Sequence, residues 1–170
     1  EEKGYLDGMQ LSRGEVSRGV GGGLCQLSNL LHWMVLHTPM TVAERHHHSF
    51  DPFPDDNRVL PFGSGCGVFY NYHDLRFFNP TDITFQLRVK VGENHLRGNI
   101  FADKAPPHTY HIVEKNHRFF RENDKTWREN EIWRETIDRT TGNIVRVDQL
   151  MKNLAEVKYE LNFDAAACNV

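Results

Sequence analysis

Residues 21–38, which read GGGLCQLSNLLHWMVLHT, contain the strongest helical pattern in the chain. Three glycines lead into apolar residues that recur at the spacing of one helix face. Apolar side chains also flank that face, which favours a well-buried helix over residues 25–37, ending before Pro39. The residues that carry this periodicity are Leu27, Leu30, Leu31, Met34 and Val35.

On both sides of this helix the spacing of apolar and polar residues is no longer helical. Residues 1–20 and 49–65 are rich in polar and turn-forming residues and are expected to be loops, with at most one short strand in residues 1–20. Residues 83–91 alternate cleanly between apolar and polar, and residues 95–102 follow as their partner strand. Thr140 to Asn143 predict the turn of a C-terminal hairpin. We therefore predict an α+β fold, in which a buried early helix follows a glycine-rich loop and packs on a mostly antiparallel sheet with C-terminal hairpins.

Length and composition narrow the class of protein. A chain of 170 residues is about one domain and can bury a sizeable core. Its formal charge of −3 disfavours nucleic acid as a partner, and its 39% hydrophobic residues disfavour disorder. No apolar run reaches the roughly 18 residues of a membrane span, so no transmembrane segment is expected. The first ten residues lack the regions of a signal peptide, which leaves the compartment open between cytoplasm and cell envelope.

Cys25 is the first candidate for chemistry, because Gly21, Gly22 and Gly23 place it at the predicted start of the helix. A helix N-terminus carries partial positive charge, which lowers the pKa of a thiol and favours the nucleophilic thiolate. Glycines let a substrate approach the backbone, and nearby N–H groups can stabilise an oxyanion. The pattern indicates a cysteine nucleophile. The alternative is a small apolar side chain buried at a tight junction.

A cysteine nucleophile needs a base, and His46, His47 and His48 follow one helix and one short strand later. In a strand, His46 and His48 share a face, so either is a candidate base. A solvated strand end is the structural alternative. No cofactor is required by this interpretation, although Cys25, His46, His48 and Cys66 are together a weaker candidate for a zinc site.

A carboxylate normally orients such a base. Asp74, at the start of a predicted strand, is one candidate for that role, Asp51, Asp55 and Asp56 are others, and the sequence does not choose among them. Three cysteines (Cys168 is the third) without a CxxC pair form neither a disulfide framework nor a standard zinc module.

An aromatic run begins next to a second glycine-rich segment. Val68, Tyr70 and Tyr72 alternate and predict a strand. We expect the aromatic side chains to pack in the core and across strands, with a ligand platform as the alternative. The run comprises Phe69, Tyr70, Tyr72, Phe77 and Phe78.

Four segments in chain order, GGGLCQLSNLLHWMVLHTP, ERHHH, DLRFFNPTD and GNIFADKAP, resemble the VanW family. The resemblance implies a single domain over residues 1–170, with a core at about 3–107 and a more divergent, strand-rich part at about 108–170. It implies a role in glycopeptide (vancomycin) resistance and peptidoglycan metabolism. Peptidoglycan stem peptides or their precursors are the implied partners.

VanW domains have been linked to L,D-transpeptidase cross-linking through their motif cysteine. Carried over, this makes Cys25 the nucleophile and His48 the base of a cysteine acyltransferase or hydrolase. Supporting residues at motif positions are Gly21, Gly22, Gly23, Gln26, Arg45, His46 and Asp74.

One position departs from the family pattern. Relatives tend to read Gly-x-Asp-Ala-x-Val where this chain has residues 64–68, and Gly65 stands in place of the aspartate. The departure makes a non-catalytic accessory or binding module the alternative function.

Overall fold

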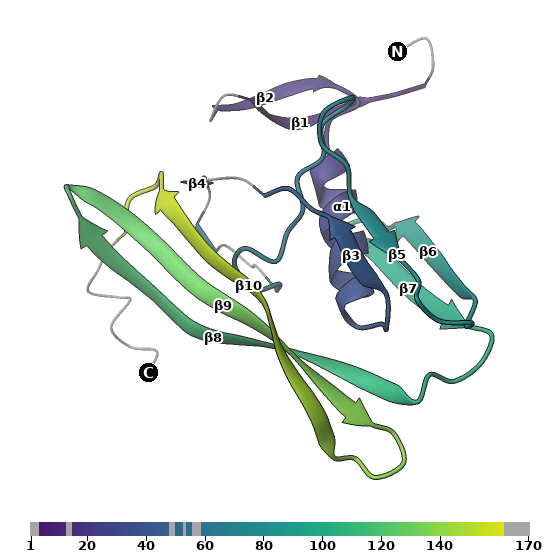
Figure 1. Cartoon of the computed structure of the whole chain (residues 1–170). Coiled ribbons are helices and arrows are strands. Elements are labelled where there is room, and N and C mark those ends of the chain that lie inside the picture. Colours follow the sequence, from purple (N-terminus) through teal and green to yellow (C-terminus); the bar gives the residue numbers. More distant parts are fainter. Residues whose placement is uncertain (1–3, 13–14, 48–49, 53, 56–58, 162–170) are drawn as a thin grey trace.

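The computed structural model describes residues 4–12, 15–47, 50–52, 54–55 and 59–161 (Figure 1). Strands dominate this part of the chain, which contains a single helix. In chain order the elements are β1 (Asp7–Ser12), β2 (Glu15–Val20), α1 (Leu24–Leu36), β3 (Thr41–Glu44), β4 (Phe50–Asp51), β5 (Arg76–Phe78), β6 (Phe85–Val91), β7 (Leu96–Ala102), β8 (His108–Glu122), β9 (Lys125–Asp138) and β10 (Ile144–Val157).

The predicted α+β fold, with a helix packed on one mostly antiparallel sheet, is wrong. Within the described residues the strands form four separate sheets: β1–β2, β3–β5, β6–β7 and β4–β10–β9–β8. The one helix, of 13 residues, lies against β3 and β7, which belong to two different small sheets. Alternation in the sequence indicates a strand but does not indicate which strands pair, so the division into sheets was not predictable from it.

The helix itself was placed correctly. It was predicted over residues 25–37 and forms over Leu24–Leu36. Its N-cap is Gly23, whose φ of 86° is left-handed and suits glycine. At its other end, Leu36 packs with Ile112 and Ile132 of the largest sheet in the hydrophobic core. The C-terminal half of α1 is therefore the part that joins the small sheets to the large one.

Two segments differ from their prediction. Residues 1–20 were expected to be a loop with at most one short strand, but β1 and β2 form an antiparallel hairpin within them. This hairpin lies on the glycine-rich segment, because a Cβ on Gly22 would be only 2.3 Å from the backbone of Gly8. Residues 66–72 were expected to be a strand, but they form only isolated bridges, His46 to Gly67 and Phe69 to His73. Backbone pairing with neighbouring segments, which periodicity does not report, decides both cases.

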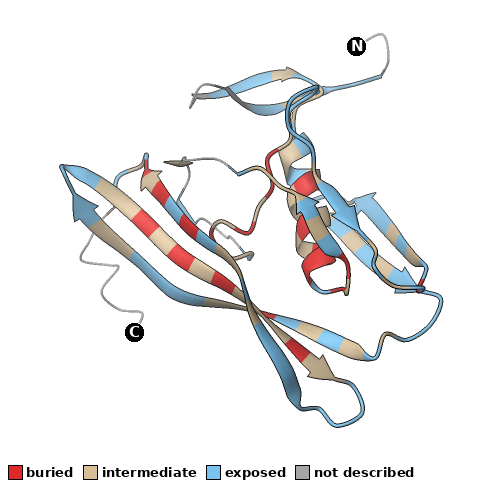
Figure 2. Cartoon of the chain, in the orientation of Figure 1, coloured by how far each residue is buried: buried red, intermediate tan, exposed pale blue. Residues whose placement is uncertain are grey.

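The presence of C-terminal hairpins was predicted, but the length of their strands was not. β8, β9 and β10 have 15, 14 and 14 residues, and pair antiparallel along almost their whole length. The turn after β9 was predicted at Thr140 to Asn143, and the carboxylate of Asp138 accepts hydrogen bonds from the Thr140 and Thr141 backbone N–H groups there. β9 is central in this sheet, and Figure 2 shows its middle, together with α1, as a main buried region.

Ile132 on β9 is fully buried in the core beside Leu36. Ile132→Ala removes buried methyl groups and leaves a cavity, so we expect the free energy of unfolding to fall by about 2–5 kcal/mol. Urea denaturation measures this loss. The control Val147→Ala, at a side chain 47% exposed on the same sheet, is expected to cost less than about 1 kcal/mol. Equal losses of unfolding free energy in the two variants would contradict the burial of Ile132 in the core.

Candidate functional site

One face of α1 carries four polar or nucleophilic side chains. They are spaced at intervals of three or four residues, so they form a stripe along a single helix face. The stripe faces residues 61–68, which we call the site loop. Its members are Cys25, Ser28, Asn29 and His32.

Each member of the stripe contacts the backbone of the site loop. The Cys25 thiol donates to the Val68 carbonyl at a sulfur–oxygen distance of 3.8 Å. The Asn29 side-chain oxygen accepts the Cys66 N–H at 2.6 Å. The Ser28 hydroxyl lies 2.5 Å from the Cys66 carbonyl and 3.1 Å from the Cys25 carbonyl. These contacts place the sulfur of Cys25 against the C-terminal end of the site loop.

His32 is a buried member of the stripe. Its Nδ1 lies 2.7 Å from the Ser64 carbonyl, and because a carbonyl only accepts, Nδ1 carries the proton. Burial lowers the pKa of His32 from 6.5 to about 4, and the charge of Arg45 adds to this. His32 is thus a neutral structural donor at pH 7 and holds the middle of the site loop.

Arg45 holds the site loop from the opposite side. Its Nε donates to the Gly65 carbonyl at 2.9 Å, and its terminal nitrogen donates to the Gly63 carbonyl. Burial lowers the pKa of this guanidinium, but an arginine remains charged throughout the physiological range. Cys66 is buried in the same loop, and this burial raises the pKa of its thiol. Cys66 is therefore poorly suited to act as a nucleophile.

His46 follows β3 and is attached to the site loop through the Gly67 N–H, which donates to the His46 carbonyl at 2.8 Å. Its Nε2 lies 3.0 Å from the Glu44 carboxylate. Its ring stacks on His73, with centroids 4.2 Å apart and planes within 7°. The hydrogen bond between His46 and Glu44 lowers the pKa of the Glu44 carboxyl group. A carboxylate and a stacked ring therefore fix the orientation of the His46 imidazole.

Asp74, one candidate for the orienting carboxylate, has an exposed side chain. Its backbone N–H contacts the Glu44 carboxylate. Glu44 also receives a hydrogen bond from Arg76 at 3.3 Å. The carboxylate that reaches a candidate base is thus Glu44, and Asp74 supports it through the main chain.

The three glycines before Cys25 use their N–H groups within the protein. Gly21 donates to the Leu6 carbonyl at 2.9 Å, and Gly23 to the Met9 carbonyl at 2.8 Å. Gly22 donates to Gly19 at 3.1 Å. Among the first N–H groups of the helix, which have no intrahelical acceptor, those of Leu24 and Cys25 are the ones nearest the thiol. An oxyanion hole at this site would use them, because the glycines serve to seat the β1–β2 hairpin.

Several predicted residues cannot be placed. His48, Asp56 and Cys168 lie outside the described residues. Among the residues that are described, no group of three or more His, Cys, Asp or Glu side chains is arranged to hold a metal ion. Gln26 is described and exposed, and its backbone N–H donates to the Gly23 carbonyl.

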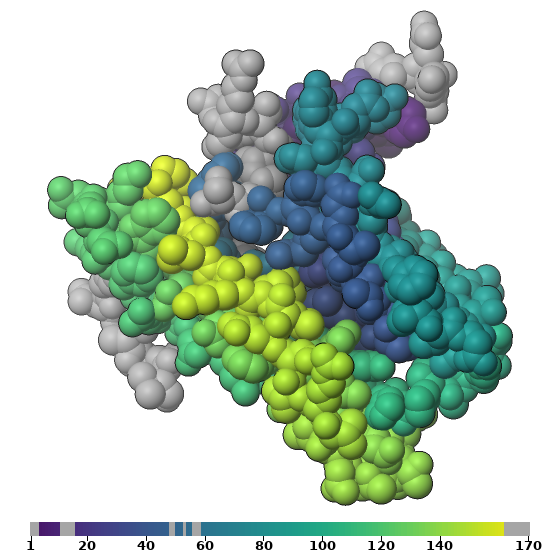
Figure 3. All heavy atoms as spheres, viewed as in Figure 1, coloured from purple at the N-terminus to yellow at the C-terminus, as the bar shows by residue number. Residues whose placement is uncertain are grey.

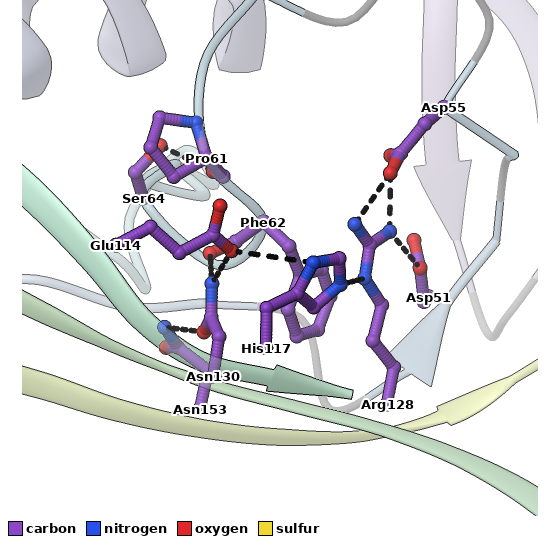
Figure 4. A network of polar contacts seen from close by, with 10 residues as sticks. All are labelled: Asp51, Asp55, Pro61, Phe62, Ser64, Glu114, His117, Arg128, Asn130 and Asn153. Atoms are coloured by element: carbon purple, nitrogen blue, oxygen red, sulfur yellow. Dashed lines mark hydrogen bonds and ion pairs between the residues drawn. The ribbon is translucent and has the colours of Figure 1, made fainter. Parts of the chain in front are cut away.

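A buried polar network holds the other face of the site loop (Figure 4). The Asn130 side chain donates to the Phe62 carbonyl at 2.7 Å and to Glu114, and it accepts from Asn153 at 2.8 Å. The guanidinium of Arg128 lies 4.4 Å from the centre of the Phe62 ring. Asn130 and Arg128 on β9, with Asn153 on β10 behind Asn130, therefore hold Phe62 near the start of the site loop. The helix contacts the same loop further along.

The network also accounts for two of the candidate orienting carboxylates. Asp51 lies 3.0 Å from the buried Arg128 guanidinium, and Asp55 accepts from two of its nitrogens. The Tyr159 hydroxyl donates to Asp51 at 2.9 Å, and burial raises the pKa of that phenol to about 12. Asp51 and Asp55 thus pair with Arg128 of the C-terminal sheet.

Sequence reasoning missed Glu44, His73 and the polar stripe. The signal for Glu44 was present, because positions 44 and 46 share a face of a strand. The stripe was also readable, as polar residues at helical spacing after Cys25. Stacking between His46 and His73 had no signal, since it depends on a bridge between segments distant in the chain.

The site therefore defines a class of domain: mostly β, with a cysteine at the start of one helix and a histidine held beside the same loop. The family model described as "VanW like protein" matches residues 1–101. The chain belongs to the VanW family.

Two curated relatives are similar to this chain. The vancomycin B-type resistance protein VanW of Enterococcus faecalis is 32% identical over 157 residues, covering 92% of this chain and 57% of the relative. The uncharacterized protein YoaR of Bacillus subtilis is 32% identical over 91 residues, covering 52% of this chain and 27% of the relative. This chain thus spans little more than half of one relative and about a quarter of the other. No solved structure matches.

The pH dependence of stability tests the placement of His32. Its folded-state pKa, about 4, lies below the ordinary value of 6.5, so the unfolded chain takes up this proton first as pH falls. The shift predicts a stability loss of about 3 kcal/mol from this one group, developing between pH 6.5 and pH 4. In urea unfolding, His32→Asn is expected to be less stable at pH 7 but to lose less on acidification.

The control for this prediction is His95→Asn, at an exposed position between β6 and β7. It is expected to keep the pH dependence of the wild type. A His32→Asn variant that loses as much stability as the wild type between pH 6.5 and pH 4 would show that His32 is not the buried neutral group.

Proposed function

We propose that this chain is a cysteine-dependent acyl-transfer domain, similar to an L,D-transpeptidase, that acts on peptidoglycan stem peptides in glycopeptide resistance. The family assignment and the named resistance relative support the biological setting. Because this chain spans only 57% of that relative, the activity of the whole protein is part of the proposal.

The observation that carries the proposal is the position of Cys25. Its half-buried thiol lies in the first turn of α1. The thiol faces the end of the site loop at Val68, and the neighbouring Gly67 is hydrogen-bonded to His46. The Cys25 thiol and the His46 main chain thus contact consecutive residues of one loop.

The reaction that follows from these groups is a two-step acyl transfer. The Cys25 thiolate attacks the carbonyl carbon of a stem-peptide amide, the C–N bond breaks, and the departing amine takes a proton from a histidine. The resulting thioester is then attacked by an acceptor amine, which forms a new amide and returns the proton and the thiol. Water as the acceptor gives a carboxylic acid instead.

Two histidines compete for the role of base. The family motif names His48, whereas His46 is held by Glu44 and His73 beside the loop that contacts Cys25. Both belong to the proposal, and separate variants distinguish them. Glu44 acts through His46, because its carboxylate accepts from the ring and so selects the tautomer.

The pH dependence of alkylation tests the thiolate. If Cys25 is the nucleophile, we expect iodoacetamide to modify it faster than Cys66 and Cys168 below pH 7, because the thiolate is the species that reacts with alkylating agents. Mass spectrometry of the labelled peptides separates the three cysteines. We expect His46→Gln or His48→Gln, whichever removes the base, to slow labelling of Cys25 by about tenfold or more.

His95→Gln is the control for these variants, because it removes an exposed histidine between β6 and β7. Labelling of Cys25 that is slow below pH 7 in the wild type, and unchanged in both histidine variants, would reject the nucleophile. Labelling that depends on one histidine alone would identify the base.

A non-catalytic binding module is the second candidate, and two observations favour it. Gly65 stands where relatives tend to have an aspartate, and a Cβ there would lie 2.7 Å from the Asn29 side-chain oxygen. The N–H groups of the three glycines are already bonded. A stem-peptide donor and acceptor assayed with wild type and Cys25→Ala separate the two functions. Turnover that Cys25→Ala abolishes supports catalysis, and equal binding without any turnover supports the module.

A further inference from the structure

The segment between the two halves of the candidate site is an exposed aromatic turn. Val68 contacts the Cys25 thiol, and His73 stacks on His46. Residues 69–72, which connect them, are Phe, Tyr, Asn and Tyr, and we call them the aromatic turn. The turn therefore directly joins the residue that contacts the thiol to the residue that stacks on His46.

The aromatic turn has a defined shape. Phe69 pairs with His73 through N–H donation in both directions, at 3.0 and 2.9 Å, and the Tyr72 N–H also donates to the Phe69 carbonyl at 2.9 Å. Asn71 has a φ of 65°, a left-handed conformation that asparagine tolerates. The rings of Phe69 and Tyr72 have centroids 5.4 Å apart. The turn presents its rings from a hydrogen-bonded backbone.

These rings were expected to pack in the core, but the structure exposes them. Phe69 is 58% exposed, Tyr70 84% and Tyr72 75%. In Figures 1 and 3 the segment before β5 extends away from the sheets, toward the end of the molecule that holds the β1–β2 hairpin. Three large aromatic side chains exposed within four residues are unusual on a protein surface and mark an interaction site.

The chemistry of the turn selects a small, uncharged ligand. Residues 69–72 carry no charged side chain, which disfavours a phosphate or an anionic lipid headgroup. Phenol hydroxyls and the Asn71 amide alternate with the ring faces, so the surface offers hydrogen bonds beside apolar planes.

A sugar ring has the matching pattern. One face of a pyranose presents C–H groups, which the negative face of an aromatic ring attracts, and its edge carries hydroxyl or acetamido groups that hydrogen-bond. We infer that the aromatic turn is a carbohydrate-binding platform that holds an amino-sugar ring of the substrate while its peptide lies at Cys25. The inference rests on the proposed function, because that function supplies a peptide attached to a glycan.

Calorimetric binding to the full chain tests the platform, with Cys25→Ala as the background so that no turnover occurs. The probes are a peptidoglycan disaccharide–pentapeptide and the same pentapeptide without sugars. We expect the sugar-bearing ligand to bind more tightly. Tyr70→Ala and Tyr72→Ala are each expected to weaken its binding by about threefold to tenfold, the range measured for an aromatic stacking pair, and to leave the free peptide unchanged.

Phe101→Ala is the matched control, because it removes a ring 49% exposed on β7, outside the candidate site. It is expected to bind the disaccharide–pentapeptide as the background protein does. Equal binding of both ligands, equal binding by the tyrosine variants, or no binding at all would overturn the platform. Tyrosine-dependent binding to phosphatidylglycerol vesicles without sugar binding would overturn it in favour of a lipid surface.

The experiments distinguish failure of the carbohydrate-binding platform from failure of the proposed acyl transfer. If Cys25 proves unreactive and no turnover occurs, but the tyrosine variants still lose sugar binding, the platform stands and acyl transfer falls. If Cys25 shows histidine-dependent reactivity while the sugar makes no difference to binding, acyl transfer stands and the platform falls.

Discussion

The structure around the candidate site depends on how residues 61–68 satisfy their backbone polar groups. Among the described residues this segment pairs with another segment only through the bridge of Gly67 to His46. Because Ser64 and Cys66 within it are buried, its other carbonyls and N–H groups need donors and acceptors other than water. Side chains supply them from three directions: the polar stripe of α1, Arg45 after β3, and Asn130 on β9. Removing one of these would leave a buried backbone group unpaired, which costs more than the hydrogen bond itself contributes.

This arrangement explains why the site lies where the parts of the fold meet. The helix is bound to the site loop at its N-terminal half and to the core of the large sheet at its C-terminal half, through Leu36. Arg45 continues directly into His46, so the same backbone that braces the loop carries the imidazole. Cys25, His46 and the aromatic turn therefore share one support.

In the described part of the chain no helix is long and apolar enough to cross a membrane.

The sequence indicated candidate residues of the site, but it did not indicate the contacts that hold them in place. The Gly-rich start of α1 located Cys25, and the motif at residues 44–48 located the histidines. Periodicity assigned residues 66–72 to a strand, because alternating Val68, Tyr70 and Tyr72 have the same pattern in an exposed turn as in a sheet. Asp74 was one of four candidate orienting carboxylates, named because it lies at the start of a predicted strand, whereas Glu44 is the carboxylate within reach of His46.

The sequence by itself determined the helix and the family, because each of these is encoded in local spacing or in a contiguous motif. Only the tertiary structure decided that the strands divide into four sheets within the described residues, that Asp51 and Asp55 pair with Arg128, and that the rings of the aromatic turn face solvent. Those outcomes depend on which distant segments satisfy each other's buried polar groups. That choice is made by three-dimensional packing, and single-sequence periodicity does not record it.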